Sequence, residues 1–173
     1  MTFTIREFSD FDVGNIYDLV SDVYATSEGM SEALEDKYPM LESFQQDVAD
    51  LLSRPGAIAL VAEREGTLLG YLTVKPRNQA KLRHTSELNM GVHHLARGQG
   101  VGKALLVEAL RQAEESAELE IIYLMVRADN TSAVRLYETM GFEKMAILDH
   151  DTKIGDSYYD GLLMRRFVKD MTG

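Results

Sequence analysis

Stretches in which hydrophobic and polar residues alternate predict the strands of this chain. The clearest is ELNMGV at residues 87–92, where every second side chain is hydrophobic and one face should be buried. A tight turn at Glu65-Gly66 predicts a hairpin between two of the strands. The predicted strands are Phe3–Phe8, Ala57–Glu63, Thr67–Lys75, Thr85–Val92, Glu120–Val126, Phe142–Leu148 and Tyr158–Phe167.

Other stretches place hydrophobic residues three and four positions apart, which is the spacing of an amphipathic helix. The predicted helices are Val13–Val23, Phe44–Leu52, Val101–Ala113 and Asn130–Met140. Ser9 with Asp12 offers capping oxygens before the first helix, and Ser43 with Gln46 forms a capping-box pattern for the second. The 173 residues contain neither a repeat nor a linker, so we expect one domain over residues 1–173.

The sequence RGQGVG, Arg97–Gly102, joins the strand at 85–92 to the following helix, and we call it the glycine turn. Glycines let a ligand approach the backbone, and the free N–H groups of a helix start favour an anion such as phosphate. The alternative is a tight connection in which the glycines only ease packing. Two common phosphate motifs fail, because Lys103 stands where GxGxxG needs glycine and Arg97 where GxxxxGK[ST] needs one.

Arg97, Gly100 and Gly102 fit the pattern (Q/R)xxGxG, and here the chain resembles the GNAT superfamily of N-acetyltransferases, with the spacing of phosphinothricin acetyltransferases. YLMVRADNTSAVRLYETMGFEKMA, residues 123–146, resembles that family's next strand and helix. The tail DSYYDGLLMRRF resembles its closing strand. The resemblance covers the C-terminal half with three motifs in order, whereas the N-terminal half agrees only in its order of elements.

The resemblance implies an α/β, three-layer fold: a mixed, largely antiparallel sheet of about seven strands, flanked by about four helices. The fourth and fifth strands, Thr85–Val92 and Glu120–Val126, should splay apart and hold the pantetheine arm of acetyl-CoA. Gln99 stands where the family often has lysine, which removes one charge near the phosphates. The implied cofactor-binding residues are Met90, Gly91, Val92, Arg97, Gly98, Gln99, Gly100, Val101, Gly102, Lys103, Asn130, Ala133 and Tyr137.

Acetylation of an amine needs a base for the ammonium proton, a donor to the oxyanion and an acid for the departing thiolate. By resemblance Glu87 is the base and Tyr137 the acid, and the N–H of Val92 is the donor, freed by a bulge that Gly91 also suggests. Each has a structural alternative: an exposed strand carboxylate for Glu87, core packing for Tyr137. Asn130 is assigned to the cofactor arm, although asparagine is also a good helix N-cap.

The chain carries 18 Lys+Arg against 28 Asp+Glu, a formal charge of −10, which disfavours nucleic acid or an anionic membrane as a partner. The resemblance implies that the acidic segment Thr26–Met40 lies over the acceptor cleft between the first two helices, which favours a cationic amine. An amino-acid-like acceptor remains open, with Arg77 or Arg83 binding its carboxylate. Those arginines belong to a basic loop, Pro76–His84. The alternative interpretation is that this loop is only exposed to solvent and binds no ligand.

No metal site is expected, because adjacent His93 and His94 would point to opposite faces of a strand. The absence of cysteine fits a reducing compartment, so we expect a cytoplasmic protein, and the resemblance allows a homodimer. The predicted function is acetyl-CoA-dependent N-acetyl transfer to a primary amine of a small molecule or peptide N-terminus, directly in a ternary complex. The alternative is a non-catalytic acyl-CoA-binding or regulatory module. The acceptor, the acyl chain length and the choice between Glu87 and a water chain as base stay open.

Overall fold

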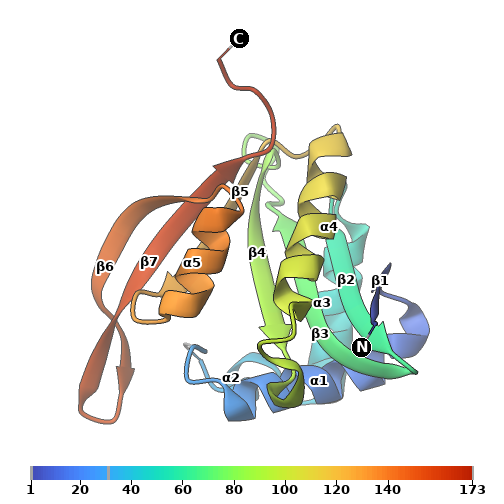
Figure 1. The fold of residues 1–173 in the computed structure, drawn as a ribbon. Helices are drawn as coiled ribbons and strands as arrows, with labels where there is room; N and C mark the ends of the chain where they lie inside the picture. The colour runs from blue at the N-terminus through green and yellow to red at the C-terminus, as the bar shows by residue number, and fades with distance from the viewer. Residues whose placement is uncertain (1, 31, 173) are drawn as a thin grey trace.

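The computed structural model describes residues 2–30 and 32–172, which form a sheet flanked by helices (Figure 1). The strands are β1 Thr4–Glu7, β2 Ile58–Arg64, β3 Thr67–Pro76, β4 Thr85–Val92, β5 Ile121–Arg127, β6 Glu143–Ile154 and β7 Ser157–Phe167. The helices are α1 Val13–Thr26, α2 Leu34–Lys37, α3 Leu41–Ser53, α4 Val101–Glu115 and α5 Thr131–Thr139, with single 3-10 turns η1 Asp10–Asp12 and η2 His94–Ala96. Within this described part no helix combines the length and hydrophobicity that crossing a membrane requires.

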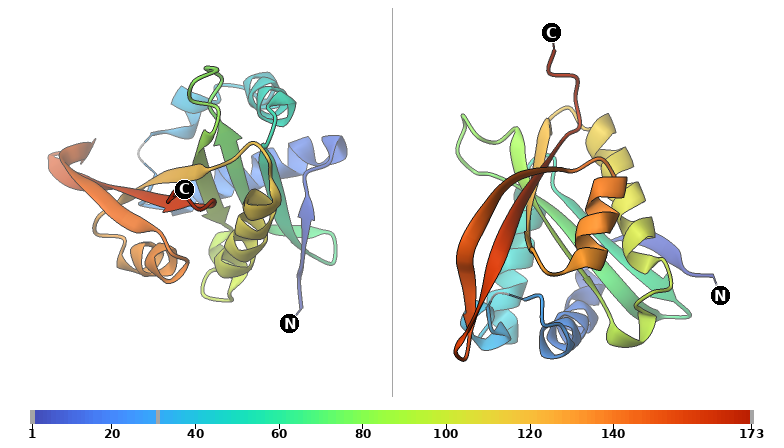
Figure 2. Two further views of the ribbon diagram at one scale, coloured as in Figure 1. Left: turned by 90° about the horizontal axis from the view of Figure 1, so that it is seen from above. Right: turned by 60° about the vertical axis from the view of Figure 1, so that its left-hand side comes forward.

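The sheet has the order β1-β2-β3-β4-β5-β7-β6, and every neighbouring pair is antiparallel except the parallel pair β4–β5. Figure 2 shows the three layers: α4 and α5 lie on one side of the sheet, and α1, α2 and α3 lie on the other. The predicted mixed, largely antiparallel α/β fold is therefore confirmed.

Each face of the sheet has its own hydrophobic core. Leu60 of β2 packs with Leu105 of α4 on one side, while the next residue, Val61, packs with Ile16 of α1 on the other. Alternation along a strand thus serves both cores at once, and residues 58–62 of β2 are all buried. Strand β2 therefore takes part in the cores on both faces of the sheet.

The sheet opens between β4 and β5. These strands pair only from Thr85↔Ile121 to Glu87↔Tyr123, so the rest of β4 has no strand on that side. On its other side β4 pairs with β3 without interruption as far as Gly70↔Val92, and the N–H of His93 then donates to Leu69 at 2.9 Å. The described β3–β4 ladder has no register shift, so the predicted bulge is wrong.

The splay itself frees backbone groups of β4. In an antiparallel pair successive residues direct their N–H and C=O alternately toward and away from the partner. Because His93 faces β3 and the last pair with β5 is Glu87↔Tyr123, the N–H groups of Met90 and Val92 face the opening. The carbonyl of Val92 agrees with this, since it accepts a 3.1 Å hydrogen bond from Arg97 rather than from β3.

The start of α3, the presence of α2 and the end of β6 differ from the predictions, because the residue types in these places did not indicate them. Helix α3 begins at Leu41, so Ser43 is its third residue rather than its N-cap; the Ser43 hydroxyl bonds the Met40 carbonyl at 2.6 Å. The short helix α2 was not predicted. Strand β6 runs on to Ile154, beyond the predicted end at Leu148, because it crosses an irregular stretch and resumes pairing at Thr152↔Tyr159.

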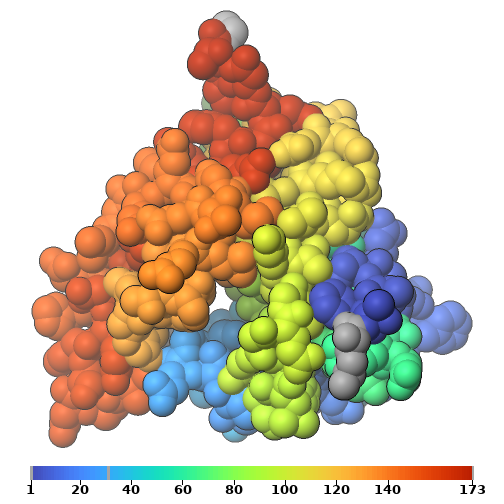
Figure 3. All heavy atoms as spheres, viewed as in Figure 1, coloured from blue at the N-terminus to red at the C-terminus, as the bar shows by residue number. Residues whose placement is uncertain are grey.

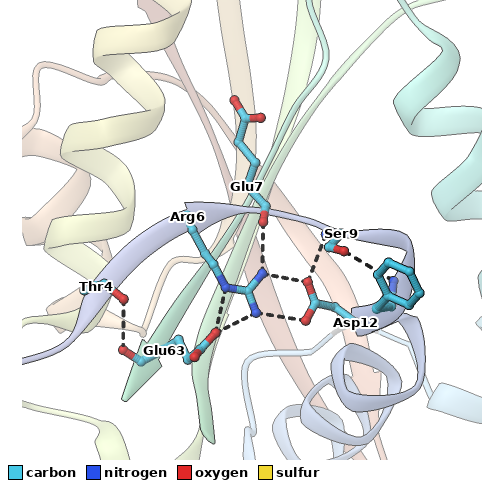
Figure 4. A network of polar contacts seen from close by, with 7 residues as sticks. Thr4, Arg6, Glu7, Ser9, Asp12 and Glu63 are labelled. Carbon is cyan, nitrogen blue, oxygen red and sulfur yellow. Dashed lines mark hydrogen bonds and ion pairs between the residues drawn. The ribbon is translucent and has the colours of Figure 1, made fainter. Parts of the chain in front are cut away.

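Ser9 and Asp12 form a capping box, but it closes the turn η1 that leads into α1, and the Asp12 side chain does not cap α1 itself. The box extends into a network that joins β1, β2 and η1 (Figure 4). Arg6 donates to both carboxylate oxygens of Asp12, at 2.6 and 2.8 Å, and contacts Glu63 at 2.6 Å. The Asp12 carboxylate also accepts the N–H of Ser9 at 2.9 Å. The Arg6 guanidinium holds the pKa of Asp12 below its ordinary value.

Candidate active site

A cavity of about 960 Å³ passes through the opening between β4 and β5 and reaches both faces of the sheet. On one face it is lined by the glycine turn and α5, and on the other by α1, α3 and the chain around α2. Figure 3 shows the hollow between α5 and the start of α4 from outside. The cavity therefore connects the predicted cofactor side with the predicted acceptor side.

Two glycines of the glycine turn have backbone conformations that other residues rarely adopt. Gly98 has a φ of +74° and Gly100, the N-cap of α4, a φ of +82°. Gly102 has an ordinary φ, and a Cβ there would lie 3.5 Å from Met90. Since the first intrahelical bond runs from Ala104 to Gly100 at 3.0 Å, the preceding amides are left for a ligand.

Gln99 and Arg97 have side chains engaged with the protein. Gln99 donates to the carbonyl of Leu95 at 2.8 Å, accepts from Arg64 at 3.2 Å, and does not line the cavity. Arg97 lines the cavity, yet its guanidinium bonds the carbonyl of Val92 and, at 2.7 Å, the hydroxyl of Thr26. Arg97 thus ties the end of α1 to the end of β4.

Glu87 lies where β4 and β5 part, on the face of the sheet that carries α3. It lines the cavity and is exposed, and its cross-strand neighbour is Lys75. The Lys75 ammonium binds Asp47 at 2.6 Å and Asp50 at 3.0 Å instead of Glu87. No described side chain forms a hydrogen bond or ion pair with Glu87, so its carboxylate is available to solvent and ligand.

Tyr137 of α5 combines core packing with access to the cavity. It is 7% exposed, and its ring lies 5.7 Å from that of Phe142. Burial raises the pKa of Tyr137 to about 12, so the phenol stays neutral and able to donate. Its hydroxyl has no hydrogen-bond partner among the described residues, and the residue lines the cavity.

Tyr71 is a second buried phenol that sequence reasoning missed. It pairs with Gly91 across β3 and β4, and a Cβ on Gly91 would lie 2.6 Å from the Tyr71 ring. The ring therefore covers the bare backbone of β4, which explains the glycine in this strand without a bulge. Tyr71 lines the cavity, burial raises its pKa, and its hydroxyl has no partner among the described residues.

Asn130 caps α5: its side-chain oxygen accepts the N–H of Ala133 at 3.3 Å. Both residues line the cavity, as do Met90, Gly91, Val92, Gly98, Gly100, Val101, Gly102 and Lys103. The cap uses the oxygen of the Asn130 amide and leaves its NH₂ group for other partners. The capping role and the predicted cofactor contact are thus compatible.

The acceptor side is less acidic than the sequence predicts. Within the segment Thr26–Met40, whose Ser31 lies outside the described residues, Glu28 lines the cavity while Glu32 pairs with Lys37 at 3.0 Å. Tyr38 donates to Asp47 at 2.7 Å, and Asp47 also binds Lys75. Arg77 and Arg83 are exposed, and neither lines the cavity.

His93 and His94 do not point to opposite faces, because β4 ends at Val92 and both belong to the turn that follows. Their rings stack with centroids 4.5 Å apart, and both face Asp22 of α1. The prediction from strand geometry is therefore wrong at this point.

Comparison with known proteins gives a consistent result. The family model described as "Acetyltransferase (GNAT) family" matches residues 17–142. The L-amino acid N-acetyltransferase AaaT of Escherichia coli is 28% identical over 127 residues, which cover 73% of this chain and 76% of that protein.

Solved structures share the fold along almost the whole chain. An acetyltransferase of the GNAT family from Streptococcus pneumoniae superposes with a TM-score of 0.89 at 23% identity, covering 97% of this chain and 100% of the other. A GNAT superfamily phosphinothricin acetyltransferase from Sinorhizobium meliloti, solved in complex with acetyl-CoA, has a TM-score of 0.85 at 22% identity and covers 96% and 89%.

Proposed function

Since the chain belongs to the acetyltransferase (GNAT) family and is an acetyl-CoA-dependent N-acetyltransferase, we propose that it passes the acetyl group directly to a primary amine while both substrates are bound. The observation that carries this proposal is the continuous cavity, which has the glycine turn on one face of the sheet and Glu87 on the other. Two substrates can therefore enter from opposite faces and meet in the opening between β4 and β5.

The glycine turn binds the pyrophosphate in this proposal. The free amides that follow Gly100 and the positive end of the α4 dipole favour an anion there. Lys103 lines the cavity and adds a positive charge. The pantetheine arm, which carries amide groups of its own, then runs along β4 and bonds the outward-facing backbone of Val92. Asn130 and Ala133 border the arm from α5.

The oxyanion donor fits Met90 better than Val92. Consecutive residues of an extended strand advance by about 3.4 Å, so Val92 lies about 17 Å along β4 from Glu87, and Met90 about 10 Å. A base and an oxyanion donor act on the same acetyl group, so the shorter separation is required. Because the N–H groups of Met90 and Val92 both face the opening, we assign the oxyanion to Met90 and the arm to Val92.

Proton transfers complete the reaction. The acceptor ammonium gives a proton to Glu87, directly or through water, and the free amine attacks the thioester carbonyl. A C–N bond forms and the C–S bond breaks. The coenzyme A thiolate takes a proton from the neutral phenol of Tyr137, and the second proton, which the acceptor nitrogen loses as the amide forms, returns through water to the Tyr137 oxygen. The unpartnered hydroxyl of Tyr71 is available to bind the acceptor amine on the opposite side.

The acceptor in this proposal is a small primary amine rather than a polycation. Lys37 and Lys75 line the acceptor side and are each paired with a carboxylate, so among the described residues only the carboxylates of Glu28 and Glu87 are left there to attract a cation. The name of the E. coli relative, an L-amino acid N-acetyltransferase, supports an amino-acid-sized substrate. One domain over residues 1–173, a cytoplasmic location and a homodimer stay predictions.

The test is to incubate the protein with acetyl-CoA and a mixed pool of amines, to follow thiol release, and to identify acetylated products by mass spectrometry. Glu87→Gln should lower turnover about 100-fold and leave acetyl-CoA affinity unchanged. Glu118→Gln, an exposed change outside the cavity, is the matched control and should have no effect. Acetyl-CoA binding without any protein-dependent product would favour the non-catalytic module.

A further inference from the structure

A cluster of three potential metal ligands lies beside the glycine turn and has no part in the proposed reaction. Asp22 projects from α1, while His93 and His94 come from the segment between β4 and α4. One ligand atom from each residue can be chosen so that all three lie within 4.8 Å of one another. In the sequence, His93 and His94 lie 71 and 72 positions after Asp22, so the tertiary fold brings the three residues together.

The distances suit a small divalent ion. Asp22 Oδ1 lies 2.6 Å from His94 Nδ1 and 3.6 Å from His93 Nε2. Two ligands of a tetrahedral zinc ion with bonds of about 2.0–2.1 Å lie about 3.3 Å apart, a value between those two distances. Each of the two distances from Asp22 therefore differs by less than about 1 Å from the spacing that a zinc ion requires.

The surroundings already orient the carboxylate. Asp22 Oδ2 accepts the backbone N–H of His94 at 3.1 Å, which leaves Oδ1 directed at the two rings. Such a bond to the second oxygen is the type of outer contact that fixes a metal ligand. Burial raises the pKa of Asp22, but the bonds from His94 outweigh it and keep the carboxylate charged.

We propose that Asp22, His93 and His94 bind Zn²⁺, with water in the fourth position, and that the ion joins α1 to the segment leading into the glycine turn. Two imidazole nitrogens and one carboxylate oxygen are a common zinc donor set. Both rings are neutral in the complex. His94 binds the ion through Nδ1 and carries its proton on Nε2, His93 binds through Nε2 and carries its proton on Nδ1, and any further ring proton passes to solvent.

The tautomer change at His93 has a local consequence. His93 Nδ1 now accepts the N–H of Leu95 at 3.2 Å, a long bond in the short turn η2. Zinc binding at Nε2 ends this bond because Nδ1 then carries the proton. The amide of Leu95 should therefore exchange faster with zinc bound, although the rest of the junction becomes more stable.

The experiment titrates Zn²⁺ into the full chain, purified without a polyhistidine tag, and follows heat and thermal unfolding. We expect one ion per chain and a rise of several degrees in the unfolding midpoint. His94→Gln and Asp22→Asn should each weaken binding more than tenfold and remove the rise. His84→Gln, a histidine outside the cluster, is the control and should bind like the wild type.

Two results would overturn the proposal. One is equal zinc affinity in the wild type, His94→Gln and Asp22→Asn; the other is no saturable binding by the wild type, which would leave the cluster as a hydrogen-bonded junction. Acetyl-CoA affinity, measured without zinc, shows whether each variant is folded. Because zinc binding is read by heat and unfolding, failure of the acetyl-transfer proposal would not affect this test.

Discussion

Replacing Gly91 by alanine tests whether the Tyr71 ring dictates this glycine. The added Cβ would lie 2.6 Å from Tyr71 Cε1 and 2.8 Å from Val23 Cγ1, closer than carbon atoms approach. Both neighbours are buried, at 8% and 2% exposure, so neither can move aside freely. Overpacking of this kind costs about 1–3 kcal/mol, and the entropy gained by removing a strand glycine offsets about 0.5–1 kcal/mol.

Taken at the middle of both ranges, the net loss of about 1 kcal/mol should lower the unfolding midpoint by about 2–4 °C in a chain of this size. Differential scanning calorimetry measures it, with Gly14→Ala as control. Gly14 is a helical residue with nothing within 4 Å of an added Cβ, so this change should be neutral or stabilising. Turnover should also fall in Gly91→Ala, because the Tyr71 hydroxyl is displaced from the cavity.

A double variant separates the ring from the backbone. If the ring is the obstacle, Gly91→Ala should cost at least about 1 kcal/mol less in a Tyr71→Ala background than in the wild type. Equal costs in both backgrounds, or a Gly91→Ala protein as stable as the wild type, would refute this explanation of the glycine.

Three further changes test other parts of the structure. Tyr137→Phe should reduce turnover at least about tenfold with little change in acetyl-CoA affinity, and an unaltered rate would remove Tyr137 as the acid. Gly100→Val should weaken acetyl-CoA binding in calorimetry, whereas Gly155→Val, also at positive φ but in the β6–β7 turn, should cost stability alone. The folded-state pKa of Asp12 is depressed, so its stabilisation is present above the unfolded pKa of about 3.9 and is lost as pH falls through the lower folded value. Asp12→Asn should therefore flatten the loss of stability measured below pH 4, and a wild-type acid profile in this variant would contradict the role of the Arg6 pair.

Much of the fold was predictable because the buried positions of this sequence are occupied by hydrophobic residues. Both faces of β2 and one face of β4 are covered, so their hydrophobic patterns match the strands observed. Strand β6 is almost entirely exposed, and no burial pattern distinguishes its second half from a loop. The start of α3 was misplaced for a similar reason: Met40 caps with its backbone, while the more conspicuous Ser43 lies inside the helix.

Part of the site was predictable because some of its backbone conformations favour one residue type. Gly98 and Gly100, with their positive φ values, are examples. Contacts between side chains from different elements could not be predicted from the sequence in this way. The role of Gly91 depends on Tyr71, twenty positions away in the sequence, and the stacking of His93 on His94 depends on where β4 ends. Local spacing identified the glycine turn, while the side chains that meet across elements required the structure.

The three-pair junction between β4 and β5 divides the sheet into two leaves, β1–β4 and β5–β7, that touch along one short seam. The outward-facing amides of Met90 and Val92 form an unfinished ladder at this seam. A pantetheine arm bonded to them would act as a surrogate strand, so the cofactor completes the architecture as well as supplying the acetyl group. Coenzyme A should then bring the leaves into one cooperative unit, with slower amide exchange on both sides of the seam.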